Sequence, residues 1–155
     1  MCIRDSSGAV ALGPLSLVEA MSWGELQSSA VPVQQFTVHF LSPYFSRKGN
    51  SQLPLPLPGS VVGSLERHWA AHAPVLATVL SRDQVELVIA HLRGETAQVQ
   101  LDHDRWIGFV GEVRYEVARG GSSARQSLGT LLSAARFTGV GSMVAYGFGV
   151  VDIDS

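Results

Sequence analysis

The chain is organised around eleven residues near its C-terminus, Gly139-Val140-Gly141-Ser142-Met143-Val144-Ala145-Tyr146-Gly147-Phe148-Gly149. The stretch contains four glycines and lies between a helical pattern and a strand pattern. Glycine permits positive φ and close backbone approach, and successive glycine N–H groups can bind an anion. The simpler interpretation is a helix that ends at Gly139, followed by a bulged strand. The sequence leaves open whether the remaining glycines contact a ligand.

The composition limits the class of protein. The 155 residues are enough for one domain, and 46% of them are hydrophobic while 15% are charged, which favours a packed core over disorder. The formal net charge is -2, so any nucleic-acid binding must be local. The single cysteine, Cys2, excludes an internal disulfide and a thiolate zinc cluster. A reducing, cytoplasmic setting is expected, and no apolar run is long enough to span a membrane.

The first part of the chain is predicted to lie outside the domain that the rest of the chain forms. Residues 1–6, Met-Cys-Ile-Arg-Asp-Ser, have no periodicity and resemble a non-native leader. The apolar segment Gly13–Met21 is compatible with the last strand of an upstream domain, and residues 28–32 read as a linker. We therefore predict that residues 1–30 are a non-native leader and a remnant or linker from an upstream domain. Residues 31–155 are predicted to form the C-terminal domain.

Hydrophobic periodicity predicts the elements of this domain. Ser42-Pro43 is expected to end the first strand, and capping-box spacings at Ser22–Glu25 and Ser123–Gln126 mark helix starts. The predicted order is a strand at Gln35–Leu41, a helix from Ser60 to before Pro74, a strand at Val85–Leu92 with Thr96–Leu101 extending its hairpin, a strand at Ile107–Val117, a helix from Ser123 to Gly139, and a strand at Val144–Ile153.

This β-α-β-β-α-β order predicts an α+β, ferredoxin-like fold. Its four-stranded antiparallel sheet carries two helices on one face, which leaves the other face for a partner such as RNA. A nucleotide-binding fold is excluded because the glycines follow a helix instead of preceding one, and the chain has no Gly-Lys-Ser/Thr motif. We therefore expect no cofactor.

Several polar and aromatic residues admit two interpretations. His39, on the polar face of the first strand, is either a general base or, more often, a cross-strand partner. His68 and His72 are spaced for a metal, but no third ligand is evident, so a solvated or partly packed helix face is favoured and no metal site is expected. Arg136 either binds a phosphate or complements the helix dipole. Tyr146 and Phe148 either stack on a base or pack in the core.

A set of spaced motifs resembles one family. The motifs are Phe40-Leu41-Ser42-Pro43, Phe45-Ser46-Arg47-Lys48-Gly49, Leu53-Pro54-Leu55-Pro56, Gly108-Phe109-Val110-Gly111-Glu112-Val113-Arg114-Tyr115, Ala135-Arg136-Phe137-Thr138-Gly139-Val140-Gly141 and Tyr146-Gly147-Phe148-Gly149. Together they resemble the C-terminal domain of the CRISPR RNA-processing endoribonucleases, the sixth Cas family of the RAMP superfamily. Where that family often has a threonine after Ser-Pro, this chain has Tyr44.

The resemblance implies two tandem ferredoxin-like domains, of which this chain holds the second, a RAMP domain. It implies metal-independent cleavage of CRISPR repeat RNA, in which a 2′-hydroxyl attacks the adjacent phosphate to give a 2′,3′-cyclic phosphate. The implied partners are the repeat RNA and other Cas subunits. The family's catalytic histidine usually lies in the first domain, so the catalytic residue here is unknown, with His39 as a candidate. The implied RNA-binding residues are Gly139, Gly141, Ser142, Gly147, Gly149, Arg136, Arg47 and Lys48.

Two other functions remain open from the sequence. A non-catalytic RAMP subunit that scaffolds guide RNA in a CRISPR effector complex would use the same glycine loop. A small-molecule-sensing ferredoxin-like domain would hold an amino acid with its loop glycines. The proline-rich segment and the adjacent Arg47 and Lys48 are poorly explained by the sensor, which we therefore rank last.

Overall fold

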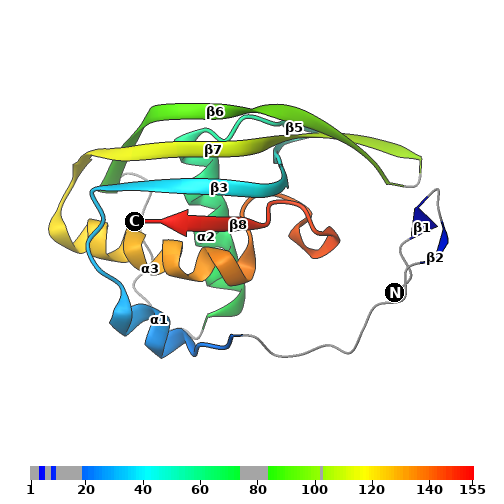
Figure 1. Cartoon of the computed structure of the whole chain (residues 1–155). Helices are drawn as coiled ribbons and strands as arrows, with labels where there is room; N and C mark the ends of the chain where they lie inside the picture. The colour runs from blue at the N-terminus through cyan, green and yellow to red at the C-terminus, as the bar shows by residue number, and fades with distance from the viewer. Residues whose placement is uncertain (1–3, 6–7, 10–18, 74–83, 102) are drawn as a thin grey trace.

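The computed structural model describes residues 4–5, 8–9, 19–73, 84–101 and 103–155 (Figure 1). Its elements in chain order are β1 (Arg4–Asp5), β2 (Gly8–Ala9), α1 (Trp23–Ser29), β3 (Gln35–Tyr44), β4 (Ser46–Lys48), β5 (Ser51–Leu53), α2 (Pro58–His72), β6 (Val85–Leu101), β7 (Asp104–Gly120), α3 (Ser122–Thr138), the 3-10 turn η2 (Val144–Tyr146) and β8 (Val151–Asp154).

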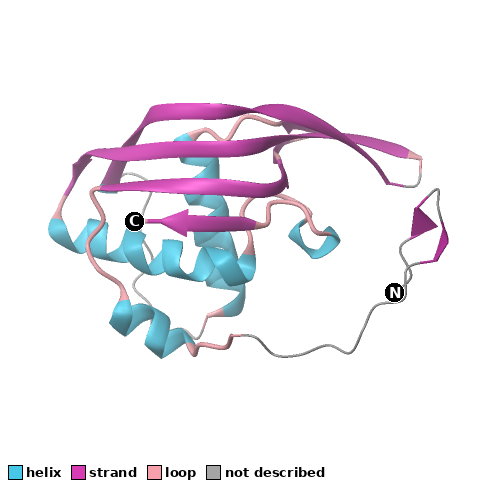
Figure 2. Cartoon of the chain, in the orientation of Figure 1, coloured by secondary structure: helices cyan, strands magenta, loops and turns pink. Residues whose placement is uncertain are grey.

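The main sheet has four strands in the order β6-β7-β3-β8, and each neighbouring pair is antiparallel. Helices α2 and α3 lie on one face of this sheet, as Figure 2 shows. This arrangement confirms the predicted ferredoxin-like fold. Two short ladders, β1 with β2 and β4 with β5, are separate from the main sheet.

The hydrophobic core lies between the sheet and the helices. Phe36, Val38 and Phe40 of β3 are each at most 2% exposed, and they alternate with more exposed neighbours. They belong to one buried cluster with residues such as Leu65 of α2 and Leu128 of α3. Burying an apolar side chain of this size stabilises the fold by about 1.5–3 kcal/mol. The alternation that predicted the strand is therefore the pattern that fixes which of its faces packs on the helices.

Three strands are longer than the sequence predicted. β3 does not end at Ser42-Pro43 but continues to Tyr44, with a register shift after Phe40. Proline lacks only the backbone donor, and the Pro43 carbonyl still accepts a hydrogen bond from the Gly149 N–H at 3.0 Å. β6 and β7 each span 17 residues and pair from end to end, so the two predicted segments of β6 are one strand.

The predicted strand at Val144–Ile153 is wrong up to residue 150. Val144–Tyr146 form the turn η2, and extended structure begins only at Val151. Met143 has a φ of 58°, and the loop glycines also have positive φ, whereas a β-strand requires negative φ. The chain therefore folds back on itself before it enters the short edge strand β8.

Local capping predicted one helix start correctly. Ser22 and Glu25 form the reciprocal capping box expected for α1, with the Ser22 N–H donating to Glu25 Oε2 at 2.7 Å. The box expected at Ser123 does not form, because α3 begins one residue earlier and Gln126 donates to the Ala30 carbonyl instead. The Gln126 side chain, which a capping box would use, makes a tertiary hydrogen bond instead.

Helix α1 packs on the domain where the sequence suggested a linker. Trp23 meets Trp69 of α2 edge to face, with ring centroids 5.0 Å apart. Leu26 is 4% exposed and belongs to the core cluster. Ser28 and Ser29 are helical, so the packed body extends N-terminal to the predicted boundary at residue 31.

Most of the predicted leader lies outside the described residues. That part includes Cys2 and residues 10–18, and also Pro74, which was expected to end the helix α2. Within the first nine residues the structure describes only the ladder of β1 with β2. An upstream domain stays a prediction.

Candidate nucleic-acid interface

The loop between α3 and β8, residues 139–150, turns its glycine N–H groups toward the protein. Their acceptors are the Ala135 carbonyl for Gly139 at 2.8 Å, Ser64 Oγ for Gly141 at 2.6 Å, the Val144 carbonyl for Gly147 at 3.0 Å, and the Pro43 carbonyl for Gly149 at 3.0 Å. All four glycine N–H groups are thus already bonded within the chain. The anion-binding concavity that glycine N–H groups would have made is not formed.

Close packing explains two of the loop glycines. A Cβ on Gly149 would lie 1.8 Å from the Val140 carbonyl oxygen, and a Cβ on Gly141 would lie 2.6 Å from the Phe45 carbonyl oxygen. Both glycines are buried and have positive φ. Gly147 differs, because it is exposed and a Cβ there would meet nothing within 4 Å. Gly141 and Gly149 therefore shape the loop, and Gly147 faces solvent.

Helix α2 anchors the root of the loop. Ser64 Oγ accepts from the Gly141 N–H at 2.6 Å and also lies 3.3 Å from the Gly141 carbonyl. His68 Nδ1 donates to the Gly139 carbonyl at 3.1 Å. Burial lowers the pKa of His68, and the hydrogen bond to Gly139 partly opposes this effect. The packed interpretation of His68 is confirmed, while His72 is exposed one turn further on.

The two aromatic residues of the loop have different environments. Phe148 is 3% exposed and packs edge to face on Phe45, with centroids 5.2 Å apart, so its core interpretation is confirmed. Tyr146 is 70% exposed at the loop tip. The neighbouring Ser142 is partly buried, and its N–H donates to the Phe45 carbonyl at 2.8 Å. Tyr146 is thus the loop aromatic that a base could reach.

Arg47 lies beside the tip of this loop. Its Nη2 is 3.5 Å from Met143 Sδ, and its guanidinium carbon is 4.7 Å from the centroid of the Trp106 ring. Trp106 in turn stacks on Phe45 at 5.2 Å. A cation over a tryptophan face gains about 0.5–1 kcal/mol at an exposed site. The aromatic residues therefore position Arg47 next to the loop, a placement that the sequence did not predict.

Three cations, Arg47, Lys48 and Arg67, form what we call the cationic cluster. They line an open pocket of about 460 Å³ between β4 and the start of α2. Among the described residues none of the three forms an ion pair with a carboxylate. The sequence predicted Arg47 and Lys48 but missed Arg67. The sequence held one indication for Arg67: it lies seven residues after Ser60, a spacing that puts both residues on one face of the helix.

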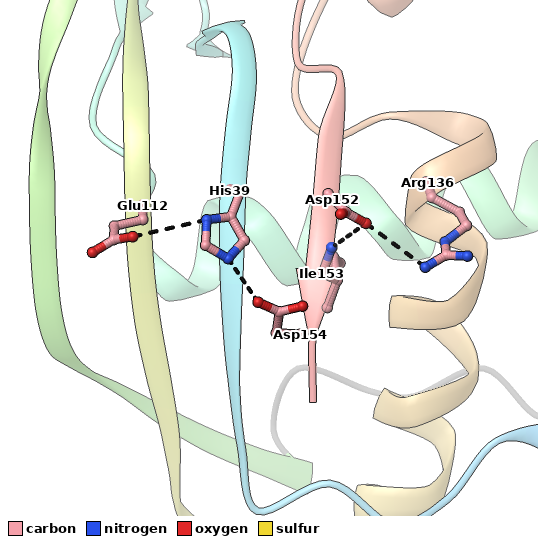
Figure 3. A network of polar contacts seen from close by, with 6 residues as sticks. All are labelled: His39, Glu112, Arg136, Asp152, Ile153 and Asp154. Carbon is pink, nitrogen blue, oxygen red and sulfur yellow. Dashed lines mark hydrogen bonds and ion pairs between the residues drawn. The ribbon is translucent and has the colours of Figure 1, made fainter.

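Arg136 lies in a different environment. It is in the last turn of α3, where a cation complements the helix dipole. Its guanidinium is 3.6 Å from Glu19 Oε1. It is also 3.7 Å from Asp152 Oδ1 (Figure 3). Among the described residues, the contacts of Arg136 are with Glu19 and Asp152, whereas those of Arg47 are with Met143 and Trp106. Two carboxylates therefore compete with any phosphate for this side chain.

The open face of the sheet carries a second group of polar side chains, His39, His91, Glu112 and Asp154, which we call the sheet-face network. His39 Nε2 is 2.9 Å from Asp154 Oδ2, and its Nδ1 is 3.8 Å from Glu112 Oε2 (Figure 3). His91 Nε2 is also 3.8 Å from Glu112. His39 is thus a cross-strand partner, the interpretation that the sequence favoured.

The strand register extends this pairing across the sheet. Arg93 lies opposite Glu112, which lies opposite His39, which lies opposite Asp152. Unlike charges that face each other across strands attract, by roughly 0.2–1 kcal/mol for a pair. Both ring nitrogens of His39 face carboxylates, so neither is free toward a substrate in this conformation.

The residues that the structure describes lack a metal-binding cluster and a membrane-spanning helix. In this part of the chain no group of three or more His, Cys, Asp or Glu residues could hold a metal ion. No helix formed by the same residues is long and apolar enough to cross a membrane.

The fold and the site first define a class of protein. It is a ferredoxin-like domain in which the glycine loop between α3 and β8 lies beside cations that form no ion pair with a described carboxylate. A family model described as CRISPR-associated endoribonuclease Cas6 matches residues 38–151. Cas6 from Thermus thermophilus aligns with a TM-score of 0.77 at 28% identity, over 86% of this chain and 58% of that chain. A Cas6 product complex aligns with a TM-score of 0.76 at 30% identity, over 87% of this chain and 56% of that chain. No curated protein matches the sequence.

The chain therefore belongs to the CRISPR-associated endoribonuclease Cas6 family, which confirms the resemblance seen in the sequence. A Cas6 substrate-mimic complex gives a similar result, with a TM-score of 0.73 at 27% identity, over 86% of this chain and 58% of that chain. The chain spans somewhat more than half the length of these structures, between 56% and 58%.

Proposed function

We propose that this chain is the RNA-binding C-terminal half of an endoribonuclease that cuts the repeats of precursor CRISPR RNA. Family membership supports this assignment, and the related Cas6 structures include a product complex and a substrate-mimic complex. The observation that carries it is Arg47, an unpaired cation that lies against both the glycine-loop tip and the Trp106 ring. Such a surface offers a phosphate contact beside aromatic rings, the combination that binds RNA strands.

The RNA backbone would run along Arg47 and Lys48 and past the loop tip. Gly147 and Ser142 would border the strand, and Tyr146 is exposed enough to stack on a base. Gly139, Gly141 and Gly149 would contribute by holding the loop in shape, because their N–H groups are already bonded. Arg136 would have to leave Glu19 and Asp152 to bind RNA, so we place the interface at the cationic cluster.

The proposed reaction is transesterification within the RNA. The 2′-hydroxyl loses its proton to a general base and attacks the adjacent phosphorus, the bond to the 5′-oxygen breaks, and a general acid protonates that oxygen. The products are a 2′,3′-cyclic phosphate and a 5′-hydroxyl. Because the nucleophile is supplied by the RNA itself, we propose a metal-independent reaction. We assign the acid and base to an upstream ferredoxin-like domain, because both ring nitrogens of His39, the candidate that the sequence offered on this chain, face carboxylates.

A repeat RNA oligonucleotide tests the proposal. Binding is measured with this chain at several salt concentrations, and cleavage with the protein that includes the upstream domain. We expect affinity that falls steeply with salt, and a cyclic phosphate in the mass spectrum of the product, with EDTA causing no loss of rate. A scrambled RNA of equal length is the control. Absence of binding by this chain overturns the proposal.

The same experiment separates the alternative function. Salt-sensitive binding without any cleavage would favour a RAMP subunit that scaffolds guide RNA in an effector complex. Assembly with other Cas subunits, and a cytoplasmic location, are further parts of the proposal. Co-purification of the tagged chain from its host tests both.

A further inference from the structure

The pocket at the start of α2 has a polar composition suited to an anion. Besides the three side chains of the cationic cluster, its lining includes the hydroxyl residues Ser46 and Ser60, and no carboxylate. Arg67 is exposed on α2 and has no ion-pair partner among the described residues. Three unpaired cations around one pocket give a local positive potential in a chain whose net charge is -2.

The first turn of α2 adds to this potential. The helix begins at Pro58, two residues before the predicted start, because proline is favoured in the first helical turn. It has no side-chain cap and no acidic residue in its first turn. The Ser60 and Val61 N–H groups both donate to the Leu57 carbonyl, and the Gly59 N–H has no acceptor in the part of the chain that the structure describes. Helix N-termini of this kind favour anions.

A buried hydroxyl at the pocket gives an independent indication. Ser46 lines the pocket and is only 6% exposed, and its Oγ has no close hydrogen-bond partner among the described residues. The Tyr44 hydroxyl, which is fully buried, interacts with the Ser46 hydroxyl. Buried polar side chains nearly always have a partner, and binding of an ion is one reason for an exception. An unsatisfied buried hydroxyl costs about 1–3 kcal/mol.

Tyr44 shows that these groups lie together. Burial raises the pKa of its phenol, while the Ser46 hydroxyl, the Arg67 guanidinium and the Ser60 hydroxyl oppose this effect in that order. Tyr44 of β3 and Ser46 of β4 therefore converge with Ser60 and Arg67 of α2, although β3 and β4 are distant from Arg67 in the sequence. The convergence is a property of the packed fold.

We infer that this pocket is a phosphate-binding site for one phosphodiester of the RNA backbone. Arg67 and Lys48 supply the charge, the Gly59 N–H and the Ser60 hydroxyl supply donors at the helix end, and Ser46 supplies the buried donor. The inference rests on the proposed function, because it names where a backbone phosphate of that RNA sits. It adds Arg67, Ser46 and Ser60 to the residues that the sequence placed at the interface.

The test compares three variants of the 155-residue chain in binding a repeat RNA oligonucleotide. Arg67→Gln should raise Kd about tenfold and lower the slope of log affinity against log salt by about 0.7–0.9, the loss of one phosphate contact. Ser46→Ala should raise Kd about threefold while the thermal midpoint stays constant or rises, because an unsatisfied hydroxyl has been removed. Arg119→Gln is the matched control, since Arg119 is exposed and pairs with Glu86 at 3.5 Å.

Inorganic phosphate provides a second arm. At constant ionic strength it should raise the thermal midpoint of the wild-type chain, and it should not do so for Arg67→Gln. Such a rise combined with normal RNA binding by Arg67→Gln and Ser46→Ala would assign the pocket to free phosphate and overturn the inference. Unchanged affinity and salt slope in both variants overturn this inference alone. Failure of the wild-type chain to bind RNA overturns the proposed function and, with it, this site.

Discussion

Two surfaces of the domain carry cations, and they differ in what surrounds each charge. On the open sheet face, Arg93 lies opposite Glu112, and His39 lies between Glu112 and Asp154. In the cationic cluster, Arg47 touches a tryptophan ring and a methionine sulfur, and no ion pair forms with a described carboxylate. On the sheet face, His39 and Arg93 thus have carboxylates beside them, whereas the cations of the cluster form no ion pair with a described carboxylate.

The difference bears on where a ferredoxin-like domain meets RNA. The sequence suggested the open sheet face, because many RNA-binding modules use it. Here Arg93 has the Glu112 carboxylate as its cross-strand neighbour, and His39 faces Glu112 and Asp154, so a phosphate would have to compete with these carboxylates. The cationic cluster forms no ion pair with a carboxylate of the described residues. A net charge of -2 is therefore compatible with RNA binding, provided that the binding surface is the one with unpaired cations.

The largest expected effect concerns the loop beside the cationic cluster. Gly149→Ala should lower the free energy of unfolding by at least about 4 kcal/mol, because its Cβ would overlap the Val140 carbonyl oxygen. Gly147→Ala should cost only about 1–2 kcal/mol, since positive φ is its sole penalty. Urea denaturation of both variants measures this difference. Equal losses would mean that Gly149 has no packing role.

The second expected effect tests the two surfaces directly. Replacing both Arg47 and Lys48 by Gln should weaken binding of repeat RNA about hundredfold, roughly 2.7 kcal/mol. Replacing Arg93 and Arg114 by Gln removes the same charge from the sheet face and should change affinity less than about threefold. Filter binding at fixed salt gives both values. A reversed order would place the RNA on the open sheet.

Much of the fold was predictable because one face of each main strand is buried. The alternation of Phe36, Val38 and Phe40 fixed β3, and the glycine at 139 correctly marked the end of α3. The path of the loop was not predictable. Val144 and its neighbours have the composition of a strand, but positive φ at the flanking glycines and at Met143 overrides that local preference.

The candidate site was predictable only in part, because it combines segments that are distant in sequence. Arg47 and Lys48 stood out as adjacent cations before a proline-rich segment. Arg67 joins them only once β4 is folded against the start of α2. Arg136 precedes the loop by three residues, yet the end of α3 points it toward Asp152. Adjacency in the sequence was therefore a poor guide to adjacency at the interface.

The third expected effect is smaller and concerns the sheet-face network. His39→Gln should leave RNA cleavage within about twofold of wild type, because both ring nitrogens face carboxylates, and should lower stability by only about 0.5 kcal/mol. Single-turnover cleavage and urea denaturation measure the two quantities, with His91→Gln as the control on the neighbouring strand. A loss of rate of about 100-fold or more would instead identify His39 as an acid–base group.

The smallest expected effect distinguishes the histidine that supports the loop from those on the surface. Burial lowers the pKa of His68 below its ordinary value, so as the pH falls through that value the unfolded chain binds a proton before the folded chain does. The free energy of unfolding of the wild type should therefore fall between about pH 7 and pH 5 more steeply than that of His68→Gln. Urea denaturation across this range provides the measurement. His72→Gln is the matched control, because His72 is exposed one turn away and its loss should leave the steeper fall in place. Equal slopes for the wild type and His68→Gln would show that the root of the loop does not sense protonation.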